Sequence, residues 1–201
     1  QATDMPSNSP SGLGRGKVYP ASAAQHLLNP LRTIVQPPGR IIRRMNLSPD
    51  SRVLEIGCGP GWFSPILAAA VPGGELTVCD LQREMLELAA VRLGTFPNIR
   101  LIQANATATP FTDAEFDAIL VSSVLGELPD PMGGLSECAR ILSPTGTLTV
   151  VETRRDSDFL RRRDLIALAA RAGLTLSVQF GPPWESTANF THAVNPRPLG
   201  H

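Results

Sequence analysis

The stretch Val53-Leu54-Glu55-Ile56-Gly57-Cys58-Gly59-Pro60-Gly61 decides the fold of this chain, together with Asp80 further on. An apolar strand runs into a loop with glycine at every second position, and a helix, a second apolar strand and an acidic residue follow. Glycine lets the backbone turn and approach a ligand without a Cβ clash. An acid about twenty residues after such a loop can accept hydrogen bonds from ribose hydroxyls. The arrangement therefore predicts a nucleotide-like pocket.

The spacing within the glycine loop narrows the ligand. A dinucleotide fingerprint needs glycine at position 62, where this chain has Trp62. The pattern is instead acid-x-Gly-x-Gly-x-Gly, with Glu55 ahead of the glycines. A carboxylate at that place repels a pyrophosphate and suits a cofactor that carries an ammonium group. In the alternative interpretation, Gly57, Gly59 and Gly61 only make a tight turn from strand to helix.

On these residues the chain resembles the class I S-adenosylmethionine-dependent methyltransferases, whose first motif reads much like VLEIGCGPG at residues 53–61. The pattern is similar to the small-molecule, methyltransferase-11 type of that family. The resemblance covers residues 47–152 well and the remainder in outline. It implies that S-adenosylmethionine is the cofactor and S-adenosylhomocysteine the product.

The resemblance also implies which residues bind the cofactor, at the carboxyl ends of the strands where open parallel sheets hold ligands. Asp80 would hold the ribose hydroxyls, and Leu81 would pack on the adenine. After the third strand the family often has an aspartate followed by an alanine, whereas this chain has Asn105 and Ala106. The neutral side-chain amide of Asn105 would then accept the hydrogen bond from the adenine amino group. The expected cofactor-binding residues are Glu55, Gly57, Gly59, Gly61, Asp80, Leu81, Asn105, Ala106 and Ser122.

For two of these residues, a purely structural role is an alternative to cofactor binding. Asp80 can instead cap the helix expected at residues 82–93. Asn105 can instead form an Asx turn within its loop.

The cysteines do not indicate a metal site or a disulfide framework. Cys58, Cys79 and Cys138 are too few and too scattered for either. We therefore expect no metal and interpret the cysteines as small apolar side chains. Thiol-assisted methylation of a metalloid is the alternative for Cys58 and Cys79.

Apolar strands alternate with helical segments along most of the chain, which predicts an α/β fold with a doubly wound, mostly parallel sheet. The expected strands are 52–56, 75–80, 99–104, 116–123, 146–153, 174–180 and 189–194, the last two forming an antiparallel edge hairpin around a loop at 181–187. The expected helices are 62–71, 82–93, 131–142 and 158–173, after a helical region at 21–45 that is broken at Asn29-Pro30 and Pro37-Pro38. The sheet is thus a seven-stranded, Rossmann-like one.

We expect three parts along the chain. Residues 1–17 form a flexible tail, and residues 47–201 form the cofactor-binding methyltransferase domain. The resemblance implies that residues 18–46 are an N-terminal helical lid over the pocket.

The expected reaction is in-line displacement that transfers a methyl group to a small, lipophilic acceptor. The protein then has to hold the acceptor in line with the methyl group and exclude water. The family often has a histidine after the fourth strand, and Glu127 occupies that place here. Glu127 would orient or deprotonate the acceptor, and Tyr19 and His26 in the lid are further catalytic candidates. Each of the three can alternatively be a surface or packing residue.

The charge balance gives no support for a nucleic-acid partner. Lys and Arg total 18 and Asp and Glu also total 18, so the chain lacks a basic excess. The arginines at 154–155 and 161–163 are interleaved with aspartates and are interpreted as a charge-paired, solvated surface. No apolar run approaches the roughly 20 residues of a membrane span. We expect a cytoplasmic protein with a small-molecule acceptor, and peripheral membrane contact stays open.

Two other functions stay open. A regulatory protein could keep the fold and bind S-adenosylmethionine without transferring a methyl group. A nicotinamide-dependent oxidoreductase is the other, although Trp62 argues against it.

Overall fold

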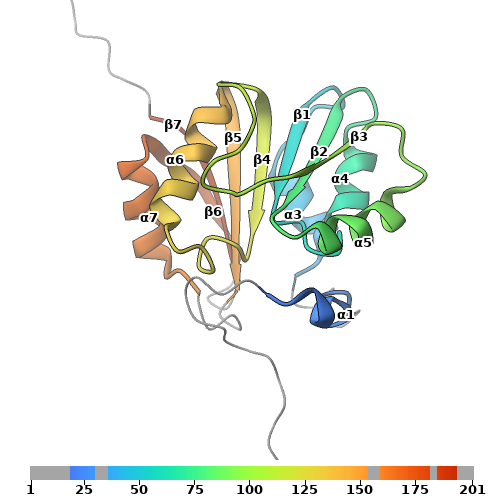
Figure 1. The fold of residues 1–201 in the computed structure, drawn as a ribbon. Coiled ribbons are helices and arrows are strands. Elements are labelled where there is room, and N and C mark those ends of the chain that lie inside the picture. Colours follow the sequence, from blue (N-terminus) through green and yellow to red (C-terminus); the bar gives the residue numbers. More distant parts are fainter. Residues whose placement is uncertain (1–18, 30–35, 154–158, 182–184, 194–201) are drawn as a thin grey trace, which may run out of the picture.

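The computed structural model describes residues 19–29, 36–153, 159–181 and 185–193. A seven-stranded sheet with the order β3-β2-β1-β4-β5-β7-β6 forms its centre (Figure 1). The strands are β1 (Arg52–Ile56), β2 (Glu75–Asp80), β3 (Ile99–Gln103), β4 (Phe116–Ser122), β5 (Leu142–Thr153), β6 (Leu174–Phe180) and β7 (Glu185–His192). The helices are η1 (Ala21–Ala23), α1 (Ala24–Leu27), α3 (Pro38–Arg44), α4 (Ser64–Ala70), α5 (Arg83–Leu93), α6 (Pro131–Ile141) and α7 (Arg162–Arg171).

The pairing of the strands confirms the predicted doubly wound sheet. Neighbouring strands from β3 to β5 are parallel, whereas β7 is antiparallel to both β5 and β6. The strand order reverses between β1 and β4, and ligands bind outside the carboxyl ends of the strands at such a switch point. Figure 1 shows α1 beyond the end of the sheet toward which β4 points.

Helices cover both faces of the sheet, and each face has its own apolar core. Helices α3, α4 and α5 lie on one face, and α6 and α7 lie on the other (Figure 1). Along β1, Val53 belongs to the first core and Leu54 to the second. Successive side chains of a strand point to opposite faces, so burial on both sides explains the nearly continuous apolar runs of the central strands.

Several predicted boundaries are confirmed. Strands β1, β2 and β6 have the predicted bounds. Helix α6 begins at Pro131, because the carboxylate of Asp130 accepts a 2.9 Å hydrogen bond from the N–H of Gly133 and so caps the helix. Helix α3 begins at Pro38, within the predicted break at Pro37-Pro38.

The predicted last strand was wrong at its start. Residues 185–187 belong to β7, where they pair with Thr153, Glu152 and Val151 of β5, and are not part of a loop. Their sequence, Glu-Ser-Thr, has neither apolar alternation nor β-rich composition. They are buried because the neighbouring strands cover them, which local sequence does not reveal.

Three other boundaries differ from the prediction. Strand β5 begins at Leu142 because α6 leads directly into it, and a register shift between Phe116 and Ala118 accommodates the extra residues. Helix α4 begins at Ser64 because the glycine loop continues through Gly61, whose φ of 80° is not helical. Helix α7 begins at Arg162, whereas the predicted start at 158 lies outside the described residues.

In the part of the chain that the structure describes, no helix combines the length and apolarity needed to cross a membrane.

Candidate functional site

The glycine loop after β1 folds back onto the end of β2. The N–H groups of Gly57 and Cys58 both donate to the carbonyl oxygen of Cys79, at 2.8 and 3.1 Å. Gly57 has a φ of 67°, and a Cβ there would lie 2.3 Å from Cγ2 of Val124. Position 57 therefore requires glycine both for its backbone conformation and for its close contact with the segment after β4.

The carboxylate of Asp80 holds this loop in place. One of its oxygens accepts a hydrogen bond from the N–H of Gly59, and the other accepts one from the N–H of Gln82, each with a length of 2.9 Å. Burial raises the pKa of Asp80, while these backbone N–H groups oppose the rise. A carboxylate oxygen has more than one lone pair, so both can accept further hydrogen bonds. Gln82 is the N-cap residue of α5, so Asp80 also binds a backbone N–H at the start of that helix, as its structural alternative expects.

Glu55 lies beneath the loop, in a buried position. Its carboxylate accepts a 2.5 Å hydrogen bond from the hydroxyl of Ser64 at the start of α4. Glu55 is 3% exposed and Ser64 is fully buried. The sequence predicts an acid near the cofactor but does not reveal that a serine nine positions later orients it.

These residues line one cavity of about 680 Å³ at the carboxyl ends of the strands. It brings together eleven residues expected from the sequence: Tyr19, His26, Glu55, Gly57, Gly59, Asp80, Leu81, Asn105, Ala106, Ser122 and Glu127. Gly61 does not line the cavity. A Cβ at Gly61 would lie 3.2 Å from Cα of Ala89, so this glycine allows the loop to pack against α5.

Residues 54–150 match the model of the methyltransferase domain family. A demethylmenaquinone methyltransferase of Staphylococcus aureus is 31% identical over 115 residues, which are 57% of this chain and 48% of that protein. Residues 54–150 therefore form a methyltransferase domain. The matched region spans about half the length of this curated relative.

Solved structures show that the methyltransferase fold extends over most of the chain. An S-adenosylmethionine-dependent methyltransferase from Aquifex aeolicus superposes with a TM-score of 0.80 at 19% identity, over 86% of this chain and 98% of that one. A TehB-like methyltransferase from Corynebacterium glutamicum gives a TM-score of 0.69 at 20% identity, over 87% and 100% of the two chains. Both likenesses concern the fold.

The cavity beside the glycine loop is suited to S-adenosylmethionine. The glycine loop presents backbone where a Cβ would intrude, and Asp80 has two oxygens for a ribose diol. Leu81, directly after β2, is 49% exposed and offers an apolar surface to a base. Glu55 and Asp80 are acidic, as a cofactor with sulfonium and ammonium charges requires.

Asn105 forms an Asx turn, the alternative to its predicted contact with adenine. Its side-chain oxygen accepts from both the N–H and the hydroxyl of Thr107, each at 3.0 Å. A hydrogen bond from the adenine amino group would have to share this oxygen. The role of Asn105 in adenine recognition stays a prediction.

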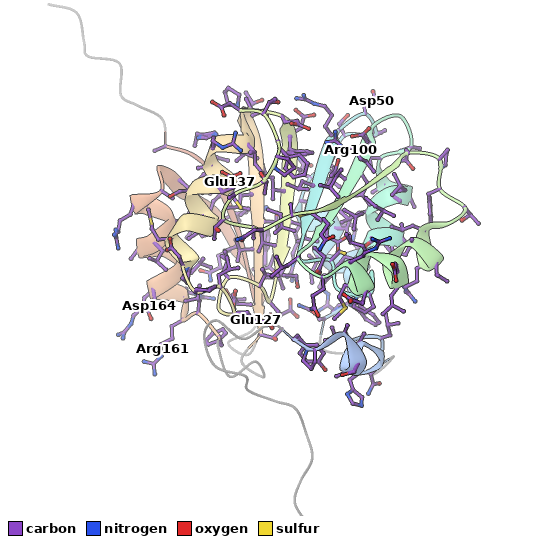
Figure 2. All side chains as sticks on the ribbon, in the orientation of Figure 1. Asp50, Arg100, Glu127, Glu137, Arg161 and Asp164 are labelled. Atoms are coloured by element: carbon purple, nitrogen blue, oxygen red, sulfur yellow. The ribbon has the colours of Figure 1, made fainter. Side chains whose placement is uncertain are left out.

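Glu127 lies at the rim of the cavity, in the turn after β4. Its N–H donates to the carbonyl oxygen of Val124 at 3.0 Å, which fixes the turn. Figure 2 shows Glu127 at the end of the sheet at which α1 lies, far from Asp50 at the opposite end. Glu127, at the family's histidine position, thus lines the same cavity as the residues expected to bind the cofactor.

The N-terminal segment contributes to the cavity from the other side. The side-chain N–H of Gln82 donates to the carbonyl oxygen of Tyr19 at 2.7 Å and so ties this segment to the start of α5. The hydroxyl of Tyr19 donates to the carbonyl oxygen of Ala23 at 3.3 Å. His26 lines the cavity from α1.

Sequence reasoning missed several cavity residues. Gln36 is 1% exposed, and its amide donates to the hydroxyl of Ser122 at 3.2 Å, joining the segment before α3 to the end of β4. Nothing around Gln36 in the sequence indicates a site. Trp62 and Phe63 also line the cavity, and Trp62 did have a signal, because it replaces the glycine of the dinucleotide fingerprint.

The three cysteines are buried, and none of them forms a disulfide. Burial raises the pKa of Cys79 and of Cys138 to about 12 and that of Cys58 well above its usual range, so all three are thiols at neutral pH. Among the described residues, no group of three or more histidine, cysteine and acidic side chains could hold a metal ion. These properties agree with the interpretation as small apolar side chains.

Proposed function

We propose that this chain transfers a methyl group from S-adenosylmethionine to a small, lipophilic acceptor. The observation that carries the proposal is that the glycine loop, Asp80 and Glu127 line one cavity of about 680 Å³. The proposed cofactor site and a carboxylate that can accept a proton thus line the same cavity. Such a cavity is the usual form of a small-molecule site.

The cofactor-binding role falls to residues at three strand ends. Asp80 binds the ribose hydroxyls, Leu81 packs on the base, and the loop from Gly57 to Gly59 lets the backbone approach the amino-acid part. Glu55 supplies negative charge near the ammonium group. When bound, S-adenosylmethionine supplies a methyl group on a sulfonium, which is already activated for transfer.

Glu127 acts on the acceptor. Its carboxylate orients the acceptor's hydroxyl or ammonium group and takes the proton that this group releases. A base positioned in this way typically contributes a factor of about 10²–10⁴ to the rate. Tyr19 and His26, which line the same cavity, position the acceptor rather than exchange its proton.

The walls near Glu127 favour a lipophilic acceptor. Val124, Leu128 and Pro129, close to Glu127 in the chain, line the cavity, and Leu27 and Phe63 add further apolar side chains to its wall. The Staphylococcus aureus relative is named for demethylmenaquinone, a quinone. We infer an acceptor with a similar aromatic ring.

The segment at residues 18–46 serves as a lid in this proposal. Its described part supplies Tyr19, His26, Leu27, Asn29 and Gln36 to the cavity. The hydrogen bond from Gln82 to Tyr19 holds it against α5. A lid of this kind would shield the reacting groups from water.

A binding protein without transfer is the second candidate, because the oxygen of Asn105 is already engaged and Glu127 replaces a histidine. Calorimetric titration with S-adenosylhomocysteine, followed by transfer of labelled methyl groups to quinols, phenols and lipid amines, separates the candidates. Saturable binding with transfer supports the methyltransferase. Binding without transfer to any acceptor supports the binding protein, and a folded chain that does not bind S-adenosylhomocysteine contradicts both.

A further inference from the structure

Ser123, the residue directly after β4, has a backbone conformation that serine rarely adopts. Its φ is 55°, in the left-handed region, which glycine and asparagine occupy at lower cost. The N–H of Ser123 donates to the carbonyl oxygen of Val151 at 2.8 Å, so β5 holds the residue in place. Ala114 has a similar φ of 56° and is not among the residues that line the cofactor cavity, so this conformation alone does not mark a functional residue.

The side chain of Ser123 distinguishes it from Ala114. Ser123 is half-buried and lines the cavity of about 680 Å³. In the part of the chain that the structure describes, its hydroxyl forms no hydrogen bond, whereas the hydroxyl of Ser122 accepts one from Gln36. Glycine would adopt this backbone with less strain but would leave the cavity wall without this hydroxyl. The partner of the Ser123 hydroxyl is therefore expected within the cavity.

The order of the strands places Ser123 next to the proposed cofactor site. In the sheet, β3, β2, β1 and β4 follow one another. The proposed contacts with the cofactor lie at the carboxyl ends of the first three, with Asp80 on β2 and the glycine loop after β1. The end of β4 comes next along this edge, and Val124 lies against Gly57 of the loop. This end of β4 is therefore left for the acceptor.

Ser123 and Glu127 flank a single turn. The N–H of Glu127 donates to the carbonyl oxygen of Val124 at 3.0 Å, and the ends of a turn closed in this way lie within about 7 Å of each other. Both Ser123 and Glu127 line the cavity. The carboxylate of Glu127 accepts hydrogen bonds, whereas a serine hydroxyl can also donate one. Together the two side chains offer an acceptor and a donor, which is the complement of a hydroxyl group.

We propose that Ser123 donates a hydrogen bond to the phenolic hydroxyl oxygen of an aromatic acceptor, whose proton passes to Glu127. The proposal rests on the proposed methyl transfer and adds the class of acceptor group. When the O–H bond breaks, the proton moves to the carboxylate and the electron pair stays on the oxygen, where the hydrogen bond from Ser123 stabilises the negative charge. A protonated amine has no lone pair to accept this hydrogen bond, so the arrangement favours a hydroxyl.

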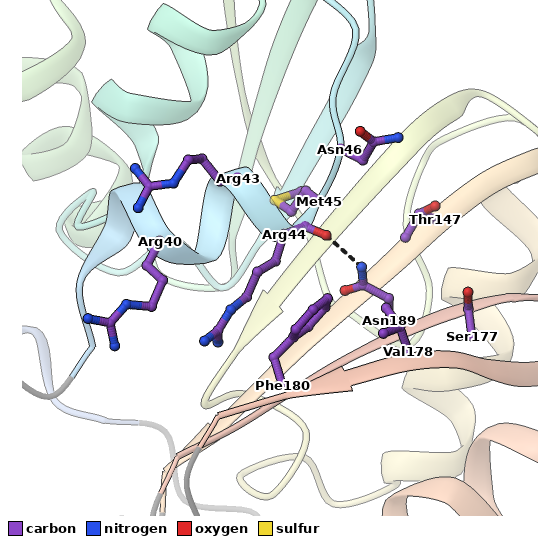
Figure 3. A pocket seen from close by; sticks show the side chains of 10 residues that line it. All are labelled: Arg40, Arg43, Arg44, Met45, Asn46, Thr147, Ser177, Val178, Phe180 and Asn189. Atoms are coloured by element: carbon purple, nitrogen blue, oxygen red, sulfur yellow. Dashed lines mark hydrogen bonds between the residues drawn. The ribbon is translucent and has the colours of Figure 1, made fainter.

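Two probes that differ by one hydroxyl, 1-naphthol and naphthalene, test this contact. Equilibrium dialysis measures the dissociation constant of each probe with the full chain saturated with S-adenosylhomocysteine. Ser123→Ala and Ser123→Gly both remove the hydroxyl, and the glycine variant also relieves the backbone. Ala114→Gly is the control for relief of the backbone alone. Ser177→Ala removes a hydroxyl from a second cavity, of about 510 Å³, between α3 and the strands β5, β6 and β7 (Figure 3), and controls for probe bound there.

The wild type should bind 1-naphthol more tightly than naphthalene. Ser123→Ala and Ser123→Gly should lose about three- to tenfold of this preference, the effect of one hydrogen bond, while their affinity for S-adenosylhomocysteine stays unchanged. Ser123→Asn keeps a donor and tolerates a left-handed backbone, so it should retain part of the preference. Both control variants should behave like the wild type.

An unchanged preference in Ser123→Ala overturns the proposal, as does an equal loss in Ser177→Ala. A wild type that binds S-adenosylhomocysteine but does not prefer 1-naphthol overturns it as well. Weaker binding of S-adenosylhomocysteine by Ser123→Gly would assign the hydroxyl to the cofactor, against the proposal. A folded wild type that does not bind S-adenosylhomocysteine would contradict the proposed function itself, and this contact with it.

Discussion

The carboxylate of Asp80, at the end of β2, accepts a 2.9 Å hydrogen bond from the backbone N–H of Gly59, 21 residues earlier in the loop after β1. The other oxygen of this carboxylate accepts a second hydrogen bond, from the backbone N–H of Gln82. One side chain thus fixes the shape of the glycine loop and presents its remaining lone pairs to the cavity. The residue that we propose to bind the ribose hydroxyls therefore also preorganises the glycine loop.

Asp80→Ala should abolish most of the affinity for S-adenosylhomocysteine. Hydrogen bonds to a charged group contribute about 1.5–3 kcal/mol each, so losing even one to the ribose weakens binding at least about tenfold. Calorimetry measures the change. Asp113→Asn, which alters an exposed carboxylate paired with Arg140, is the control and should bind like the wild type. Equal affinities of Asp80→Ala and the wild type would contradict the assignment of the site.

Gly57→Ala should destabilise the protein more than Gly173→Ala. Both glycines have a positive φ, of 67° and 80°, so alanine strains the backbone at either position. Only at Gly57 would the new Cβ meet a neighbour, Val124, whereas nothing lies within 4 Å at Gly173. Left-handed backbone alone costs about 1–2 kcal/mol, and the clash with Val124 adds to this at Gly57. Denaturant unfolding measures both variants, and a similar loss in each would show that Val124 moves aside.

Ser64→Ala should lower the free energy of unfolding by about 1–3 kcal/mol, because it removes a donor from the buried carboxylate of Glu55. Ser136→Ala, at an exposed position of α6, should change stability by less than about 0.5 kcal/mol. Urea unfolding of the two variants tests this. A stability of Ser64→Ala indistinguishable from that of Ser136→Ala would show that the hydroxyl is dispensable for Glu55.

Glu127→Gln should reduce turnover by about 10²–10⁴ while leaving the affinity for S-adenosylhomocysteine unchanged. The amide keeps the shape of the side chain but cannot take a proton. Glu127→His, which installs the residue type common in the family, should restore part of the rate with a shifted pH profile. Glu84→Gln, at an exposed position of α5, is the control. Full turnover in Glu127→Gln would remove Glu127 from the mechanism.

The stability of the protein should depend on pH through Glu137. Its hydrogen bonds with Arg140, and then those with Thr109, lower the pKa of Glu137 to about 2. A carboxyl with a pKa below its unfolded value of about 4.3 adds stability above that value, and this stability is lost as the pH falls toward 2.

The difference in unfolding free energy between the wild type and Glu137→Gln should therefore be greatest above about pH 5, on the order of 1–3 kcal/mol, and shrink in acid. Chemical denaturation at a series of pH values measures it. Because the Arg140 side chain is 35% exposed, added salt should reduce the difference at neutral pH. A difference that stays constant from pH 7 to pH 3 would contradict the ion pair.

Much of the site could be predicted because its residues follow strands in a recognisable order. Asp80 and Ser122 each end a strand, and parallel strands bring their carboxyl ends to one edge of the sheet. Gly61 shows the limit of such reasoning. It belongs to the same motif as Gly57 and Gly59, yet it packs against Ala89 of α5 instead of lining the cavity. Motif membership does not say which side of the loop each glycine faces.

The sequence by itself determined the order of strands and helices, the glycine loop and its acid, because these depend on local periodicity and on the backbone freedom of glycine. The tertiary structure was needed to show that Gln36 reaches Ser122, that residues 185–187 belong to a strand, and that Arg44 of α3 stands over Phe180. These pairs lie far apart in the chain and have no local pattern. Their contacts arise from the packing of α3 and the edge hairpin against the sheet, which no single segment encodes.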